Sequence, residues 1–111
     1  MGNLKKIREQ KAATQGRCCW YCGHPTWADD SGEFATRHRM TIREAERFKQ
    51  TAEHLVAKCD GGQDTEANIV MACHYCNSRR HRMRKPLSPS KYKLRVHARL
   101  AAGRWHGRSP P

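Results

Sequence analysis

The sequence predicts a small α+β fold in which two short strands are followed by a helix, with further helices on either side. Two short apolar runs, residues 53–58 and 69–73, are separated by a stretch rich in turn formers, as expected for paired strands. Residues 74–85 lack β-branched side chains and stop at Pro86, which is typical of a helix ended by proline. With 111 residues and 37% hydrophobic content, the chain has room for one domain with a modest core.

The N-terminal half predicts two helices and a loop. Residues 3–14 place Leu4 and Ile7 near helical spacing among good helix formers, so a short helix is expected there. Residues 24–39 carry turn formers without a clear period and predict a loop or insertion. Thr41 and Glu44 then fit the capping-box pattern, which predicts a helix at about residues 42–50.

The C-terminal part predicts one more helix, over residues 90–102, followed by a frayed tail from residue 104. The expected organisation has three parts. A basic N-terminal helix occupies residues 1–17, the main domain covers residues 18–85 with an insertion at about residues 24–52, and a basic helix and tail fill residues 86–111.

Two Cys-x-x-Cys pairs, Cys19/Cys22 and Cys73/Cys76, are the strongest motif in the chain. Two such pairs about fifty residues apart, without a thioredoxin-like pattern around either, favour a structural zinc ion held by four thiolates. The alternatives are a redox pair or reduced core cysteines. Cys18 could replace Cys19 as a ligand, although Cys19 matches the spacing of the second pair, and Cys59 is expected to be a free thiol.

The N-terminal residues are polar and basic, and no stretch approaches the roughly 20 apolar residues of a membrane span. We therefore expect a cytoplasmic protein, in which paired cysteines favour metal over disulfides.

The net charge of +12 is concentrated at one end of the chain. Residues 1–66 contain eleven Lys or Arg and ten acidic residues, whereas residues 67–111 contain eleven Lys or Arg and no acid. Such a segment attracts polyanions, of which nucleic acid is the commonest, although a solvated basic tail would have the same composition.

Residues 53–62, EHLVAKCDGG, followed by residues 68–81, NIVMACHYCNSRRH, resemble the HNH endonuclease family in its form with two Cys-x-x-Cys pairs. The resemblance covers roughly residues 18–83. It implies a ββα-metal fold, a hairpin packed on a helix with one catalytic divalent cation between them, and DNA, most simply double-stranded, as the substrate. Small nucleases of this kind serve in restriction, in mobile elements and in phages.

The resemblance also implies roles for individual residues. His54 matches the histidine that acts as general base, and Glu53 stands where the family usually has an Asp or His metal ligand. Asn68 matches the asparagine that braces the loop and orients that histidine. Asn77 takes the position of the last metal ligand, and His81 matches an additional helix histidine found in colicin-type members.

The positions of these residues on a strand and on a helix limit which of them can act together. Neighbouring strand residues point to opposite faces, so Glu53 and His54 act together only if the strand is distorted or the metal contacts one side. Asn77 and His81 are four residues apart and share a helix face, as two ligands of one cation would. Oxygen ligands suit Mg²⁺ or Mn²⁺, whereas participation of His81 would favour a softer transition ion.

The expected phosphate contacts are basic residues in and around the helix after the second cysteine pair: Lys58, Arg79, Arg80, Arg82, Arg84 and Lys85. Trp20 and Tyr21 are expected to pack in the core rather than to stack on bases. The sequence thus predicts a metal-dependent DNA endonuclease. The alternative is a zinc-binding module that grips DNA or RNA without hydrolysing it, and a thiol oxidoreductase is a weaker third possibility.

Overall fold

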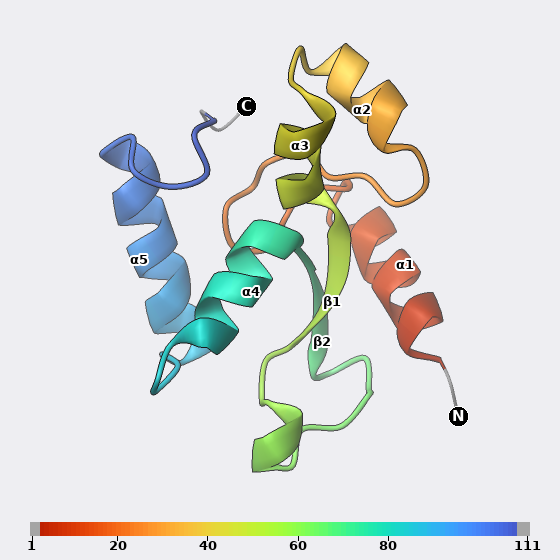
Figure 1. Ribbon diagram of the computed structural model, residues 1–111. Coiled ribbons are helices and arrows are strands. Elements are labelled where there is room, and N and C mark those ends of the chain that lie inside the picture. Colours follow the sequence, from red (N-terminus) through yellow and green to blue (C-terminus); the bar gives the residue numbers. More distant parts are fainter. Residues whose placement is uncertain (1–2, 109–111) are drawn as a thin grey trace.

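A two-stranded antiparallel hairpin forms the centre of the fold in the computed structural model (Figure 1). The structure describes residues 3–108 of the chain. Strands β1 (Gln50–His54) and β2 (Ile69–Cys73) pair in register from Gln50 opposite Cys73 to His54 opposite Ile69. The helices, in chain order, are α1 (Leu4–Thr14), α2 (Ser31–Arg37), α3 (Ile42–Ala45), α4 (His74–Arg82) and α5 (Pro89–Ala101), with short 3₁₀ turns η1 (Glu46–Phe48) and η2 (Lys58–Asp60).

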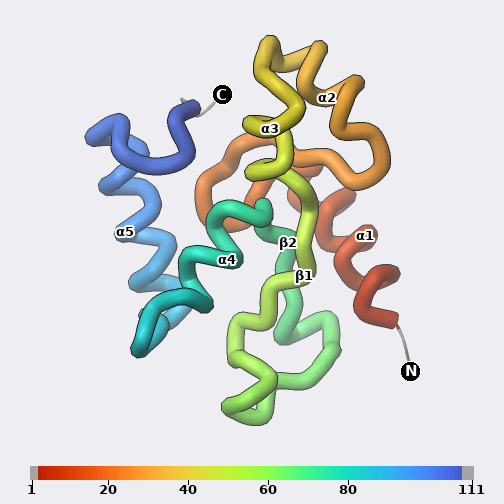
Figure 2. The backbone as a smooth tube through the Cα atoms, viewed as in Figure 1, coloured from red at the N-terminus to blue at the C-terminus, as the bar shows by residue number. Residues whose placement is uncertain are grey.

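Helices α1 and α4 flank the hairpin, and α5 lies beyond α4 (Figures 1 and 2). All five residues of β2 are buried, because helices and the cysteine-rich turn cover this strand. On α1, Ile7 and Ala12 are buried, and the Gln15 side chain just beyond α1 makes two hydrogen bonds to the backbone of Met71. The predicted α+β order of strand, strand and helix is confirmed.

The second strand has its predicted bounds, but the first is shifted. β1 covers residues 50–54 rather than 53–58, since pairing ends where the Leu55 amide donates to the Asn68 carbonyl and the chain leaves the ladder. The β-compatible residues after His54 instead enter the loop that contains η2. Register with the buried β2 strand decides the bounds, and local propensity does not.

The stretch expected to be a loop at residues 24–39 contains helix α2. Its N-cap is Asp30, whose side chain accepts a hydrogen bond from the Glu33 amide at 2.9 Å, and it buries Phe34 and Ala35. Seven residues are too short to display a helical period, so capping and tertiary burial stabilise a helix that the pattern does not reveal. The predicted capping box of Thr41 and Glu44 is present, with both hydrogen bonds at 3.0 Å.

The C-terminal segment after α5 is packed rather than frayed, so the expectation of a loose tail from residue 104 is wrong up to residue 108. His106 is 1% exposed, and its carbonyl accepts from the Arg47 guanidinium at 2.9 Å. The Trp105 indole donates to Cys76 Sγ at 3.3 Å. Residues 109–111 of the predicted tail lie outside the described residues.

None of the helices within residues 3–108 is long and apolar enough to cross a membrane.

Candidate metal centre and active site

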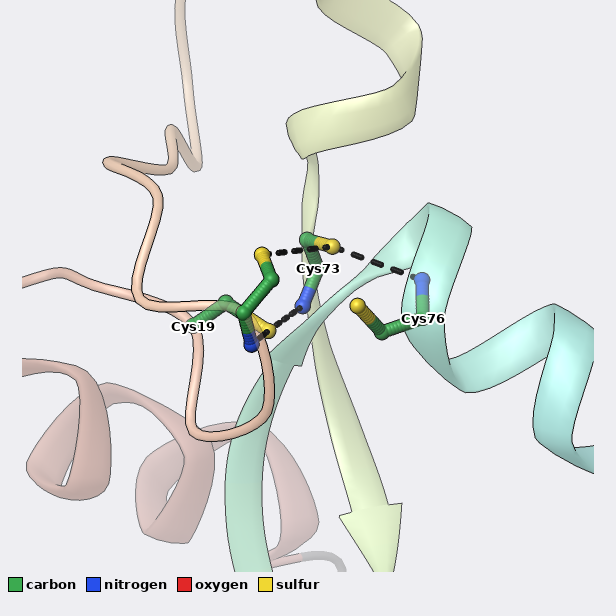
Figure 3. A group of neighbouring side chains, drawn as sticks. Cys19, Cys73 and Cys76 are labelled. Carbon is green, nitrogen blue, oxygen red and sulfur yellow. Dashed lines mark hydrogen bonds between the residues drawn. The ribbon is translucent and has the colours of Figure 1, made fainter. Parts of the chain in front are cut away.

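Four buried cysteines meet where the hairpin, the Cys19 turn and the start of α4 come together. Their Sγ atoms all lie within 4.8 Å of one another, and Cys22 Sγ is 3.9 Å from Cys73 Sγ. Figure 3 shows the sulfurs of Cys19, Cys73 and Cys76 facing one point. Tetrahedral Zn–S bonds of about 2.3 Å place sulfurs about 3.8 Å apart, so the cluster is consistent with a structural zinc site.

Backbone amides around the cluster are arranged to stabilise thiolates. Cys19 Sγ accepts from the amides of Tyr21, Cys22 and Cys73 at 3.3–3.5 Å, and Cys73 Sγ accepts from the Cys76 amide at 3.4 Å. Burial opposes ionisation of Cys19, but hydrogen bonds from the other three cysteines outweigh it and hold its pKa well below the usual value. A thiolate at Cys19 is the form that binds a metal.

The two remaining cysteines lie outside the cluster. Cys18 Sγ is 3.5 Å from the Gly16 carbonyl, and Cys59 is exposed in the loop between the strands. The structure therefore favours Cys19 over Cys18 as a metal ligand. It also agrees with the expectation that Cys59 is a free thiol.

Glu53 lies at the end of β1 and is almost completely buried, with 1% of its surface exposed. Its Oε2 atom accepts from the Tyr21 hydroxyl at 2.8 Å and from Arg80 Nη1 at 3.0 Å. Its Oε1 atom lies 2.7 Å from Nε2 of His81 on α4. Burial and the neighbouring carboxylate raise the pKa of Tyr21, so the tyrosine stays a hydrogen-bond donor to Glu53.

Arg80, expected to contact phosphate, is instead an internal residue with 5% exposure. Besides Glu53, its guanidinium donates to the carbonyls of His54, Leu55 and Leu87 at 3.1–3.2 Å. A planar group with five donors satisfies four acceptors here, and this secures α4 to the end of β1. Arg80 is therefore occupied inside the protein and does not face a nucleic-acid ligand, contrary to the prediction.

His54 engages a different element from its neighbour Glu53. Its Nε2 atom lies 2.7 Å from Oδ1 of Asp64, in the loop between the strands. This hydrogen bond lowers the pKa of the Asp64 carboxyl, which keeps it ionised and acceptor-only. The proton of the pair is then on Nε2, and in neutral His54 the Nδ1 atom has a free lone pair.

Asn68 braces the same loop, as the resemblance implies. Its side chain exchanges hydrogen bonds with the backbone of Val56 at 2.8 and 3.0 Å and donates to the Gln63 carbonyl at 3.0 Å. No hydrogen bond joins Asn68 to His54 among the described residues, so any effect on His54 passes through the loop that carries Asp64. Gly62 is required in this loop, because a Cβ there would lie 1.7 Å from the Val56 carbonyl oxygen.

Asn77 and His81 lie on the face of α4 that meets β1. Asn77 Nδ2 donates to Thr51 Oγ1 at 3.0 Å, one turn of helix before the contact between His81 and Glu53. Among residues 3–108, the four cysteines are the one group in which three or more His, Cys, Asp or Glu ligand atoms lie within 4.8 Å. Glu53 and His81 form a pair, and a cation there would need the Asn77 amide oxygen or water to complete its shell.

The other basic residues expected at a nucleic-acid interface are on the surface. Lys58, Arg79, Arg82, Arg84 and Lys85 are exposed. Tyr21 packs in the core as expected and also donates to Glu53, and Lys93 lies over the Trp20 ring at 4.3 Å.

Asp64 is the functional candidate that sequence reasoning missed. It is one of three acidic residues in the polar loop after His54, together with Asp60 and Glu66, and nothing in their spacing singles it out. Only the folded path of the loop places its carboxylate against the imidazole.

Comparison with known proteins agrees with the pattern in the sequence. Residues 43–83 match the family model described as HNH endonuclease, a span that contains both strands, the loop and α4. Searches among curated proteins and among solved structures gave no match. Residues 43–83 of this small α+β chain, which form the strand, strand and helix beside the buried cysteine cluster, are thus similar to the HNH endonuclease family.

Proposed function

We propose that this protein is a metal-dependent endonuclease that hydrolyses phosphodiester bonds in DNA, with His54 as general base. The observation that carries the proposal is the pairing of His54 with Asp64 at the end of the strand on which Glu53 faces His81. A module that only binds nucleic acid has no need of an imidazole oriented by a carboxylate.

In the proposed reaction, Asp64 holds the His54 ring with the proton on Nε2, so Nδ1 accepts a proton from the attacking water. Positioning and general-base catalysis of this kind contribute about 10²- to 10⁴-fold to the rate. Asn68 acts indirectly by holding the loop path that brings Asp64 to His54.

Glu53, His81 and Asn77 would hold the catalytic cation. The Glu53 Oε1 and His81 Nε2 atoms, 2.7 Å apart, are close to the separation of neighbouring ligands on one ion. When bound, the cation would polarise the scissile phosphate and stabilise the leaving oxygen. The imidazole beside the carboxylate favours a transition ion such as Mn²⁺ over Mg²⁺.

The four-cysteine cluster has a separate role in the proposal. Zinc would be bound by Cys19 and Cys22 in the turn after α1 and by Cys73 and Cys76 at the start of α4. It would thereby fix the position of α4, the helix that carries Asn77 and His81. The cluster offers no open position for substrate, because all four ligands are protein sulfurs.

Incubation of supercoiled plasmid with the zinc-loaded protein and Mg²⁺ or Mn²⁺, beside His54→Ala, tests the proposal. We expect the wild-type protein to convert supercoiled plasmid to nicked or linear forms only with a divalent cation, and His54→Ala to bind the plasmid without cutting it. If both proteins shift the plasmid on a gel but leave it intact with every metal, the protein is a binding module.

A further inference from the structure

A basic cleft of about 210 Å³ lies between α4 and α5. It lies outside the set of residues proposed for hydrolysis, and most of its lining comes from α5 and the segment after it. It is lined by Arg79, Met83, Tyr92, Arg95, Arg99 and Trp105.

Three guanidinium groups enclose the cleft without a counter-charge. Arg95 and Arg99 are four residues apart on one face of α5, and Arg79 comes from α4. All three are exposed, and within residues 3–108 none takes part in an ion pair. Residues 67–108, which include α4 and α5, contain no acid that could neutralise them. Cations gathered in this way repel one another until an anion binds between them.

The two aromatic residues that line the cleft are held by hydrogen bonds to Cys76. The Trp105 indole donates to Cys76 Sγ at 3.3 Å, and the Tyr92 hydroxyl donates to the Cys76 carbonyl at 2.6 Å. Both rings are therefore attached to the cysteine cluster. The Arg79 guanidinium lies 4.1 Å from the centroid of the Tyr75 ring, which limits its motion. The planar fork of arginine matches phosphate oxygens, so three arginines that line one cleft favour a phosphate ligand.

The cleft faces away from the proposed catalytic residues. Asn77 and His81 lie on the face of α4 that meets β1, and Arg79, two residues from each, lies about 200° around the helix. One side of α4 thus carries the metal-binding candidates and the other side carries the cleft. A ligand that reaches both sides of α4 must be extended and must carry repeated negative charges, as duplex DNA does.

We propose that the cleft of Arg79, Arg95 and Arg99 binds a backbone phosphate of duplex DNA, away from the phosphate that is cut. This proposal rests on the proposed endonuclease function and extends its substrate surface to α5, which lies beyond the residues that match the family model. Phosphate contacts of this kind set the position and affinity of the protein on DNA rather than its sequence preference.

The test compares Arg95→Ala/Arg99→Ala with Lys5→Ala/Lys6→Ala by fluorescence anisotropy on a labelled duplex, without added divalent cation. Both double variants lose two positive charges from exposed helix positions, but the lysines lie on α1. We expect the arginine variant to raise Kd about tenfold or more at low salt and, because one phosphate contact is lost, to reduce the slope of log Kd against log salt by about 1. The lysine variant should change both quantities much less.

The outcomes separate this inference from the proposed function. If the wild-type protein binds the duplex and the arginine variant binds equally well, or no worse than the lysine variant, the cleft is not a phosphate site, and the endonuclease proposal stands. If the wild-type protein binds no duplex, both proposals fail. Should the arginine variant lose zinc or helicity, Arg99→Gln alone is compared by the same criterion.

Discussion

The Nε2 atom of His54 lies 2.7 Å from Oδ1 of Asp64, ten residues further along the chain and in the loop between the two strands. This carboxylate fixes the ring orientation and the tautomer of His54, and both determine whether Nδ1 can accept a proton. The pair depends on the loop path, which Asn68 and Gly62 hold in place.

Replacing Asp64 by alanine should slow DNA cleavage about tenfold to hundredfold, because His54 loses the group that orients it. Substrate binding should be retained, so the loss should appear in kcat rather than in KM. The measurement is steady-state cleavage of a labelled duplex over a range of pH. Asp60→Ala, in the same loop, is the control and should cleave at the wild-type rate. Equal rates for Asp64→Ala and wild type would remove Asp64 from the mechanism.

Arg80→Met should destabilise the protein by about 3–5 kcal/mol, because it leaves the carboxylate of Glu53 buried without its cationic partner. Thermal or urea unfolding of the zinc-loaded protein measures this loss. Arg82→Met removes the same charge from an exposed position of α4 and should change the free energy of unfolding by less than about 0.5 kcal/mol. Similar stabilities for the two variants would mean that the buried pair is not a structural contact.

Removing the metal from the cysteine cluster should unfold the domain, because four thiolates join segments more than fifty residues apart in a chain with a small core. We expect one zinc ion per chain by elemental analysis and a loss of helical circular dichroism after chelation. Cys22→Ser should behave like the chelated protein, and Cys59→Ser, an exposed cysteine, should not. A protein that keeps its fold and melting temperature without zinc would contradict the assignment.

The buried His106 should make stability depend on pH. Burial, with a smaller effect of His24, lowers the pKa of His106 to about 4, below its value of about 6.5 in the unfolded chain. The unfolded chain therefore binds a proton that the folded protein excludes between these values. Stability should be complete above about pH 6.5 and fall by about 3 kcal/mol as the pH decreases to about 4.

His106→Phe keeps an aromatic ring among Phe48 and Tyr75 and should flatten this dependence. Unfolding is measured between pH 5 and 7.5 with the zinc content checked at each pH, since thiolates also bind protons in acid. An unchanged pH dependence in His106→Phe would show that another group is responsible.

The sequence predicted the parts of this protein in which a local pattern has a strong physical cause. The spacing of two Cys-x-x-Cys pairs identified the buried cysteine cluster, and the apolar run of residues 69–73 identified β2 with its bounds. The capping box of Thr41 and Glu44 is an interaction within four residues, so it could also be predicted from the sequence.

The features that the sequence did not reveal depend on contacts between distant segments. Helix α2 is too short to display a helical period. The segment from Trp105 to Arg108 is held by the hydrogen bond from Trp105 to Cys76. Arg47 also donates to the His106 carbonyl, and Arg108 donates to the His38 carbonyl. Arg80 has the same local sequence context as its exposed neighbours, and only the position of α4 against β1 directs it inward. The role of Asp64 also depends on a tertiary contact, because only the folded loop brings its carboxylate to His54.

The general-base role of His54 is tested most directly by the single-turnover rate of duplex cleavage. The duplex is saturated with protein, Mn²⁺ is added, and the rate constants of wild type and His54→Ala are compared. Saturation removes differences in binding, so the rate constant reports the chemical step. His74→Ala, which removes an exposed imidazole at the start of α4, is the matched control.

We predict that His54→Ala is slower than wild type by about 10²- to 10⁴-fold, whereas His74→Ala cleaves at close to the wild-type rate. Equal single-turnover rates for wild type and His54→Ala would contradict the assignment of His54 as the general base.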